Sequence, residues 1–276
     1  MSPTASLEMT SNVVESPDEI LQIRIHGPEA GPILIFLPGI HGDWTLVTPF
    51  RAQISRSLRF VEFTYPRTLE WTLHDYAKHI IDALAAHEIT HGWLLGESFG
   101  SQVVWAICDL LQCGPQPPPF KIEGIILAGG FAAYPMKRLA RRLESMRSRT
   151  PGRGSLPLMY IYAILLRVRF RGSLEARQAA AEFLARRTLL DAQAIHHRLR
   201  LLIACDPAPV IATVKAPVFY LSGLLDPIVP WFLVRKQLRR VSPSYRETKI
   251  IPTADHNVLG TAPVASARQI LNWLNV

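Results

Sequence analysis

The spacing of apolar residues in the first half of the chain alternates between two periods. Residues 20–26 alternate apolar and polar side chains, which predicts an edge strand with one buried face. Apolar positions recur at three- and four-residue steps over 71–87, and a mostly apolar helix is predicted over 101–111. Four apolar runs predict further strands, at residues 32–37, 59–65, 92–95 and 122–128. Strands that alternate with helices indicate βαβ units and a mostly parallel sheet.

The pattern changes after Phe131. Helical periodicity then continues without a convincing strand, over residues 135–149, 156–168, 173–185 and 191–204. The alternation resumes with predicted strands at 218–221 and 248–251 and predicted helices at 230–240 and 263–274. A helical block inside a βα series predicts a cap over the carboxyl ends of the strands. We therefore expect an α/β fold in which a mostly parallel central sheet is flanked by helices. Residues 1–130 and 206–276 would form this core, and residues 131–205 an inserted all-helical cap.

The segment Gly96-Glu97-Ser98-Phe99-Gly100 lies between a predicted strand and a predicted helix. This is the G-x-S-x-G pattern of a nucleophile elbow, in the context that the elbow requires. A serine at such a turn has a strained backbone, and the strand and helix approach so closely that only glycine fits two positions away on either side. Ser98 is therefore the candidate nucleophile. The alternative is a glycine-flanked turn without a catalytic role.

With this motif in place, the chain resembles the α/β-hydrolase-fold serine hydrolases, a family of esterase- and lipase-like enzymes. The likeness runs from the second predicted strand to the C-terminus. In that family, the loop after the first buried strand supplies a backbone donor to the oxyanion hole. Here that loop is residues 37–43, and it has Pro38-Gly39 where His-Gly is commoner. The resemblance implies that the N–H groups of Ile40 and Phe99 serve as donors, with His41 as the alternative to Ile40.

The same resemblance implies an acid and a histidine after the nucleophile, and the sequence offers both in that order. Asp226 lies in the segment 221–230, which follows a predicted strand and is similar to the acid loop of the family. His256 follows the next predicted strand, although Asp255 stands where the family more often has glycine. His256 would act as the general base and Asp226 would orient it. Taken singly, each of the two could be an ordinary turn residue. The resemblance implies no metal and no organic cofactor.

Net charge alone would suggest nucleic acid as a partner, because the 276 residues carry a formal charge of +8. That charge is concentrated from Lys137 to Arg200, where one lysine and fourteen arginines face four acidic residues, a net +11. The arginines follow helical spacing without the interleaved aromatic residues of a nucleic-acid-binding module, so we expect no nucleic-acid partner. A solvated arginine-rich helical surface is the simpler interpretation. Contact of the basic cap with an anionic substrate or an acidic membrane surface is a second hypothesis.

Cysteine content and hydropathy bear on the compartment. Three cysteines, Cys108, Cys113 and Cys205, are too few for a disulfide framework. No apolar run approaches the roughly 20 residues that span a bilayer, and the polar N-terminal segment does not have the pattern of a secretory signal. We expect a cytoplasmic protein.

The apolar segment 156–166 lies where the predicted cap would cover the active site. Met159, Tyr160 and Tyr162 are candidates to line a hydrophobic acyl or alkyl pocket, or else simply pack the cap onto the core. The sequence thus predicts a serine hydrolase that acts on a small-molecule ester or thioester with an apolar part, through an acyl-enzyme. The alternatives are an acyltransferase, a C–C bond hydrolase, and a non-catalytic ligand-binding protein of the same fold.

Overall fold

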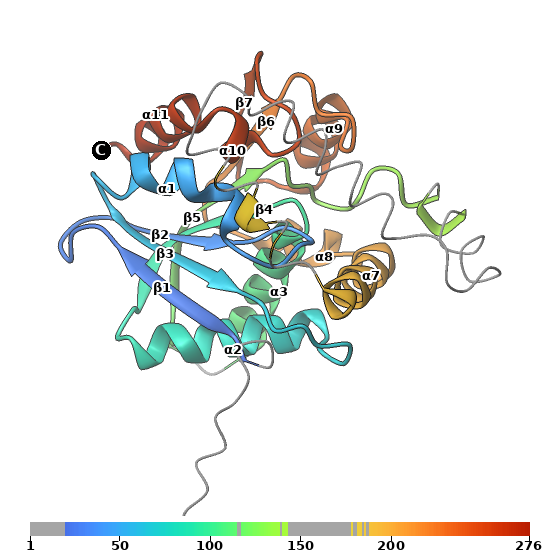
Figure 1. Ribbon diagram of the computed structural model, residues 1–276, viewed down its shortest axis with the longest axis horizontal. Coiled ribbons are helices and arrows are strands. Elements are labelled where there is room, and N and C mark those ends of the chain that lie inside the picture. Colours follow the sequence, from blue (N-terminus) through green and yellow to red (C-terminus); the bar gives the residue numbers. More distant parts are fainter. Residues whose placement is uncertain are drawn as a thin grey trace, which may run out of the picture.

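A computed structural model of the chain describes residues 20–114, 117–138, 140–142, 178, 181–183, 185 and 188–276. These residues contain one seven-stranded sheet in the order β1-β3-β2-β4-β5-β6-β7 (Figure 1). The strands are β1 (Gln22–His26), β2 (Ile33–Leu37), β3 (Arg59–Thr64), β4 (His91–Glu97), β5 (Lys121–Ala128), β6 (Val218–Gly223) and β7 (Tyr245–Ile251). Only β1 runs antiparallel to its neighbour, so the predicted edge strand and the predicted mostly parallel sheet are both confirmed.

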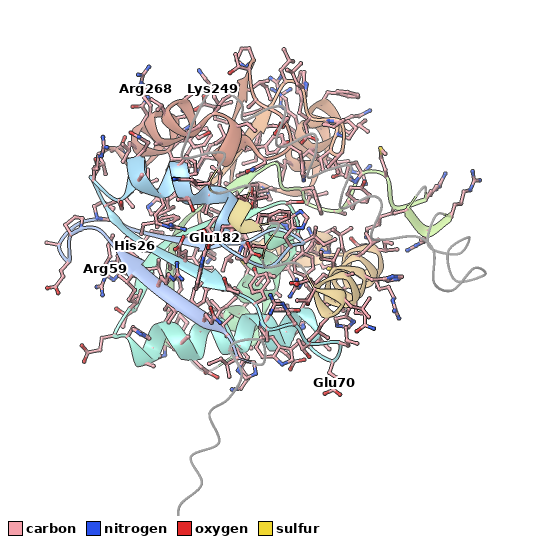
Figure 2. All side chains as sticks on the ribbon, viewed as in Figure 1. His26, Arg59, Glu70, Glu182, Lys249 and Arg268 are labelled. Atoms are coloured by element: carbon pink, nitrogen blue, oxygen red, sulfur yellow. The ribbon has the colours of Figure 1, made fainter. Side chains whose placement is uncertain are left out.

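Helices cover both faces of this sheet. In chain order they are the 3-10 turn η1 (Thr45–Val47), α1 (Thr48–Ile54), α2 (Leu73–Ala86), α3 (Gly100–Cys113), α7 (Leu189–Ala204), α8 (Ala208–Thr213), α9 (Trp231–Val241), α10 (Val258–Thr261) and α11 (Pro263–Leu274). The packed pair α1 and α11 lies on one side of the sheet and the packed pair α2 and α3 on the other (Figure 1). Charged side chains such as Glu70 and Lys249 lie at the periphery (Figure 2).

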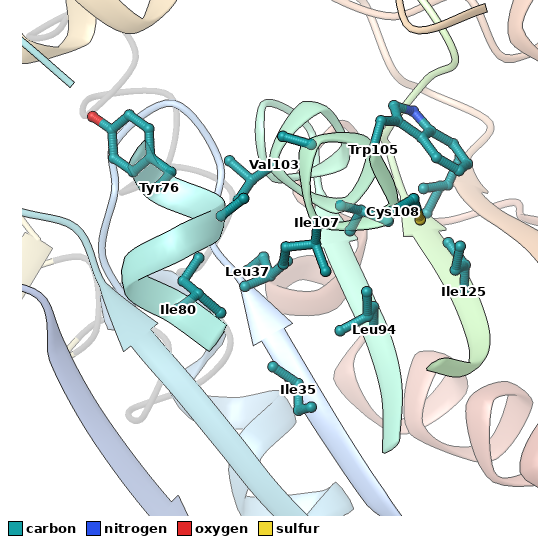
Figure 3. Close-up of a cluster of buried hydrophobic side chains, with 14 of the residues drawn as sticks. Ile35, Leu37, Tyr76, Ile80, Leu94, Val103, Trp105, Ile107, Cys108 and Ile125 are labelled. Atoms are coloured by element: carbon teal, nitrogen blue, oxygen red, sulfur yellow. The ribbon is translucent and has the colours of Figure 1, made fainter. Parts of the chain in front are cut away.

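Strand β2 shows why an apolar run can be continuous. All five of its residues are buried, because successive side chains point into two different cores. Ile35 and Leu37 pack together with Leu94 of β4 beneath α2 and α3 (Figure 3). Leu34 and Phe36 point to the opposite face, in the core that includes residues of α1 and α11.

The order of the strands creates a switch point next to β2. The chain leaves β2 for β3 on one side and later places β4 on the other side of β2. The loops that follow β2 and β4 therefore begin side by side at the carboxyl edge of the sheet. In open α/β sheets this is where ligands bind.

Three short helices were not predicted from the sequence: α1, α8 and α10. Each has seven residues or fewer, which is too short for a repeated helical period. The longer predicted helices are all present where the structure describes them. At α2, for example, Thr72 and Asp75 form a capping box, and the backbone and hydroxyl hydrogen bonds from Thr72 lower the pKa of Asp75.

The predicted cap is described only in part. Helix α7 confirms the helix predicted over 191–204 but begins two residues earlier, at Leu189, because Thr188 and Asp191 form a second capping box there. Residues 143–177 lie outside the described ones, and with them Met159, Tyr160 and Tyr162. The pocket and the three-part division of the chain therefore stay predictions.

Two further expectations concern the chain as a whole. Cys108, Cys113 and Cys205 are free thiols, as their number suggested. In the part of the chain that the structure describes, every helix is too short or too polar to cross a bilayer.

Candidate active site

Ser98 occupies the sharp turn between β4 and α3. Its φ of +48° lies in the left-handed region, which non-glycine residues rarely adopt. The flanking glycines are needed for the reason inferred from the sequence. A Cβ on Gly96 would lie 2.9 Å from the backbone of Ser101, and a Cβ on Gly100 would lie 2.1 Å from the carbonyl oxygen of Leu37. The elbow is thus packed directly against the end of β2, and the strained turn projects the serine side chain from the sheet edge.

The structure brings Asp226 and His256 together with Ser98. His256 Nε2 lies 2.9 Å from Ser98 Oγ, and His256 Nδ1 lies 2.8 Å from Asp226 Oδ2. Asp226 Oδ1 also accepts hydrogen bonds from the N–H groups of Ile228 and Val229, both at 2.8 Å. The Asp226 side chain is completely buried, whereas the His256 side chain is 14% exposed. The carboxylate is therefore fixed on both oxygens, and the imidazole bridges it to the serine.

Two loops make this pairing possible, because β6 and β7 are neighbours in the sheet. Asp226 follows β6, and His256 follows β7. A Cβ on Gly223, the last residue of β6, would lie 2.3 Å from the carbonyl oxygens of Ala254 and Asp255. Glycine at this position lets the two loops pack in direct contact, and this contact brings Asp226 within hydrogen-bonding distance of His256.

Electrostatics around His256 favour its protonated form. Burial disfavours the imidazolium, but the hydrogen bond and the negative charge of Asp226 outweigh that cost, with smaller contributions from Glu97 and Asp255. The net effect raises the pKa of His256 above its usual value. This arrangement suits a base that takes up a proton during a reaction and later returns it.

The loop Gly39-Ile40-His41-Gly42 follows β2 and lies next to Ser98. The Gly42 N–H donates to the Gly39 carbonyl at 2.9 Å, and the Gly42 carbonyl accepts from the N–H of Tyr65 at 2.7 Å. A Cβ on Gly39 would lie 3.5 Å from Ser98 Cβ, so the loop passes close to the serine. Within the described part of the chain, the N–H of Ile40 has no hydrogen-bond acceptor.

The backbone N–H of Phe99, the residue after the serine, is also available as a donor. Phe99 precedes the first residue of α3, and its N–H has no acceptor among the described residues either. Ile40 and Phe99 therefore each keep a backbone donor available near Ser98, as the oxyanion prediction requires. His41, the alternative donor, packs its ring edge-on against Phe183, which lies in the segment predicted to form the cap, with the ring centroids 4.7 Å apart.

Glu97 is a second carboxyl beside Ser98, on a residue that is half-buried. It accepts a hydrogen bond from the N–H of Gly39. Burial raises the pKa of Glu97 to about 7, and the charges of Asp43 and Asp255 act in the same direction. The Gly39 hydrogen bond and the charge of His256 offset part of this increase. Asp43 itself accepts from the N–H of Thr45 at 3.0 Å, in a local turn.

Sequence reasoning missed one residue at this site. The sequence indicates a solvated arginine-rich surface, and that interpretation is wrong for Arg198, which is 1% exposed and contacts the 39–42 loop. A signal was present. Ala194 and Leu202 lie one turn before and one turn after it, and all three occupy the buried stripe of α7.

The described residues contain no group of three or more His, Cys, Asp or Glu side chains arranged to hold a metal ion. What they do contain is a serine, an imidazole and a carboxylate in a hydrogen-bonded row, with two backbone donors nearby. Such a set can form and break a bond to a carbonyl carbon.

The comparisons with known proteins agree with this architecture. The sequence model of the alpha/beta hydrolase fold matches residues 58–263, so the chain belongs to the alpha/beta hydrolase fold family. No curated protein matches the sequence.

Three solved structures illustrate the likeness. One is an esterase from Thermogutta terrifontis, with a TM-score of 0.71 and 18% identity over 92% of this chain and 93% of that one. A hydrolase from Pseudomonas aeruginosa PA01 has a TM-score of 0.73 and 15% identity, over 93% of this chain and 94% of that one. The enol-lactonase from Burkholderia xenovorans LB400 has a TM-score of 0.69 and 17% identity, over 93% of this chain and 96% of that one. At these identities the likeness shows the fold.

Proposed function

We propose that the protein is a serine hydrolase that cleaves a carboxylic ester or thioester through Ser98, His256 and Asp226. One observation carries the proposal: the continuous row of hydrogen bonds from Asp226 through His256 to Ser98, at 2.8 and 2.9 Å. The three residues come from three loops at the carboxyl edge of the sheet, in the chain order that the family resemblance implies. Structures with the same fold include an esterase and an enol-lactonase, which supports an ester bond as the target.

The mechanism follows from the geometry. Ser98 Oγ attacks the substrate carbonyl carbon while His256 Nε2 takes the hydroxyl proton. Negative charge develops on the carbonyl oxygen, where the N–H groups of Ile40 and Phe99 would stabilise it. The bond to the leaving alcohol or thiol then breaks, and His256 returns the proton to that group. Asp226 holds the imidazole in the correct tautomer and balances its charge.

Water completes the cycle. His256 removes a proton from a water molecule, whose oxygen attacks the acyl-enzyme carbonyl carbon. The bond to Ser98 Oγ breaks, the acid is released, and the serine regains its proton from His256. In this mechanism every proton transfer in both halves uses His256 Nε2, and its distance of 2.9 Å from Ser98 Oγ supports that role.

Labelling with a fluorophosphonate probe tests the proposal directly, because the probe reacts only with an activated serine. We expect the wild type to be labelled and Ser98→Ala to be unlabelled. Ser57→Ala is the matched control, because Ser57 is an exposed serine between α1 and β3 and this variant should label like the wild type. A folded wild type that resists the probe would contradict the proposal and favour a non-catalytic ligand-binding protein.

A second measurement identifies the acceptor of the acyl group. Hydrolysis of p-nitrophenyl esters of increasing acyl length, with and without an added alcohol or thiol, separates acid from transfer product. We expect the acid to be the main product at every chain length. Preferential transfer to the added nucleophile would instead identify an acyltransferase.

A further inference from the structure

Arg198 joins helix α7 to the loop that carries the proposed oxyanion donor. Its Nη1 donates to the carbonyl oxygens of Ile40 at 3.0 Å and His41 at 3.1 Å. Its Nη2 donates to the carbonyl oxygen of Pro66 at 2.8 Å. One side chain of α7 thus ties together the loops that follow β2 and β3.

The surroundings of this guanidinium are unusual for a buried charge. Nε donates to the hydroxyl of Tyr76 at 3.3 Å, and the group lies 5.6 Å from the centre of the Tyr65 ring. Among the described residues, none of its hydrogen-bond partners is a carboxylate. Removing an arginine from water without an opposing charge is costly. An apolar side chain would fill the same volume at lower cost but could not bind the loop carbonyls.

Arg198 binds two carbonyl groups of the loop. Because the C=O and N–H of a trans peptide point in opposite directions, these bonds also set the direction of the N–H group in each of the two peptides. The carbonyl of Ile40 points to Arg198, so the N–H of His41 points away from it. The carbonyl of His41 also points to Arg198, so the N–H of Gly42 is turned toward the carbonyl of Gly39. Because the Gly39 carbonyl accepts from the Gly42 N–H, the N–H of Ile40, on the other side of the same peptide plane, points away from the loop interior. It has no acceptor among the described residues.

A residue of the elbow completes the arrangement. Glu97 accepts from the N–H of Gly39, at the other end of the loop. With Glu97 holding the first N–H and Arg198 holding two carbonyls, the peptide planes from Gly39 to Gly42 are each fixed by at least one hydrogen bond.

Helix α7, which carries Arg198, is attached to the core by further contacts. Asp191 forms an ion pair with Arg67 at 2.8 Å, and the His197 ring hydrogen-bonds to the carbonyl oxygen of Trp71 at 2.8 Å. Together with Arg198, these contacts attach the helix to residues 66–71 at three points. Hydrogen bonds from Arg198 therefore join the 39–42 loop to a helix that is itself attached to residues 66–71.

We propose that Arg198 is a positioning residue that orients the Ile40 and His41 peptides so that the loop can donate to the substrate oxyanion. The inference rests on the proposed function. It predicts a selective loss of transition-state stabilisation when Arg198 is replaced, because the donors remain in the chain but lose their fixed direction.

The experiment compares Arg198→Met, which keeps the length of the stem, with Arg200→Met, which removes an exposed arginine from the same helix. We expect Arg198→Met to lower kcat for a p-nitrophenyl ester by about 10- to 100-fold, less than the loss of a whole oxyanion donor, with KM nearly unchanged. Arg200→Met should match the wild type. A rise in KM at constant kcat, or an unchanged kcat in a folded Arg198→Met variant, would overturn the proposal.

Hydrogen–deuterium exchange of a peptide covering residues 37–43 provides a readout that needs no activity. We expect faster exchange in Arg198→Met than in the wild type and in Arg200→Met. Unchanged exchange would overturn the positioning role. If the wild type is not a hydrolase, the fluorophosphonate test fails while exchange still decides whether Arg198 orders the loop.

The conservative variant covers the case in which Arg198→Met does not fold. Arg198→Lys keeps the charge but replaces the planar, forked donor with a single ammonium group, which cannot bind three carbonyls in the same geometry. We expect it to fold, with kcat between those of the wild type and Arg198→Met. A kcat equal to that of the wild type would show that charge alone suffices and would overturn the proposed geometric role.

Discussion

The two sides of Ser98 are held by different kinds of contact. On the side of the base, His256 is fixed by Asp226, and both residues lie on loops that leave adjacent strands. On the proposed oxyanion side, the 39–42 loop is held by Glu97, next to the serine, and by Arg198, which is 158 residues from Ile40 in the sequence. The base side is assembled within the sheet, whereas the oxyanion side depends on a helix that packs over it.

This difference predicts which substitutions should remove a chemical group and which should only change the direction of the backbone donors. A change on the base side would remove a group that the proposed mechanism uses in proton transfer. A change on the oxyanion side leaves the chemical groups in place and alters only their direction. The two kinds of damage differ in size and in pH dependence, so they can be told apart.

The largest loss of activity is expected from Asp226→Asn, which removes the carboxylate that contacts His256. An amide cannot stabilise the imidazolium or hold the correct tautomer of His256, so kcat should fall by roughly 10⁴-fold. Steady-state kinetics with a p-nitrophenyl ester measure this. Asp255→Asn is the matched control, because Asp255 accepts backbone and hydroxyl hydrogen bonds that an asparagine oxygen can also accept. Equal losses in the two variants would contradict the assignment of the acid.

A smaller effect is expected from Gly42→Ala, which disturbs the oxyanion side. Gly42 has a φ of +81°, and a Cβ there would lie 2.5 Å from Nη1 of Arg198. We expect a loss of about 1–3 kcal/mol in the free energy of unfolding and a decrease in kcat.

Gly31→Ala serves as the control for that substitution. Gly31 also has a positive φ, of +132°, but the nearest atom to its Cβ would be 4.0 Å away. It should therefore destabilise the protein through the backbone alone and leave kcat unchanged. Denaturant unfolding and kinetics on both variants separate backbone strain from displacement of Arg198, and a loss of kcat in both would argue against the coupling.

The pH dependence links the two sides through Glu97. Its negative charge is one of the contributions that raise the pKa of His256. Glu97→Gln removes that charge, so the pKa of His256 should fall and kcat/KM should be retained to lower pH. The acid limb of a kcat/KM profile reports this directly. An acid limb at the same pH as in the wild type would show that the two groups do not interact.

The smallest effect concerns stability. The pKa of Glu97 is about 7 in the folded protein, above the ordinary 4.5, so the folded state binds this proton more tightly than the unfolded state. Its contribution to stability is therefore lost as the pH rises from about 4.5 to about 7. Glu97→Gln lacks this loss, and its Tm relative to the wild type should be higher at pH 8 than at pH 5. A difference in Tm independent of pH would contradict the raised pKa.

The base side could be predicted from the sequence because its signals are local. Ser98, Asp226 and His256 each follow an apolar run, and glycine marks both sides of the elbow. The strands were equally clear, since the continuous apolar run of β2 reflects burial on both faces. Glu97 also carried a local signal, because it adjoins the nucleophile.

Arg198 and Phe183 could not be placed by such signals. Their partners lie more than a hundred residues away in the sequence, and an arginine in a segment with a net charge of +11 resembles a solvated one. The buried stripe of α7 indicates that position 198 faces inward. Which carbonyls Arg198 binds depends on tertiary packing over the loops after β2 and β3, which no short-range pattern encodes. The short helices α1, α8 and α10 were missed for a related reason, because packing rather than periodicity stabilises them.

The position of β7 at one edge of the sheet has a consequence for the behaviour of the protein at high concentration. An edge strand exposes a row of backbone groups that can pair with another molecule. Here the strand carries the exposed charged residues Arg246, Glu247 and Lys249, and Lys249 points away from the molecule (Figure 2). These charges oppose edge-to-edge pairing, and so the strand that leads to His256 also protects the fold against aggregation.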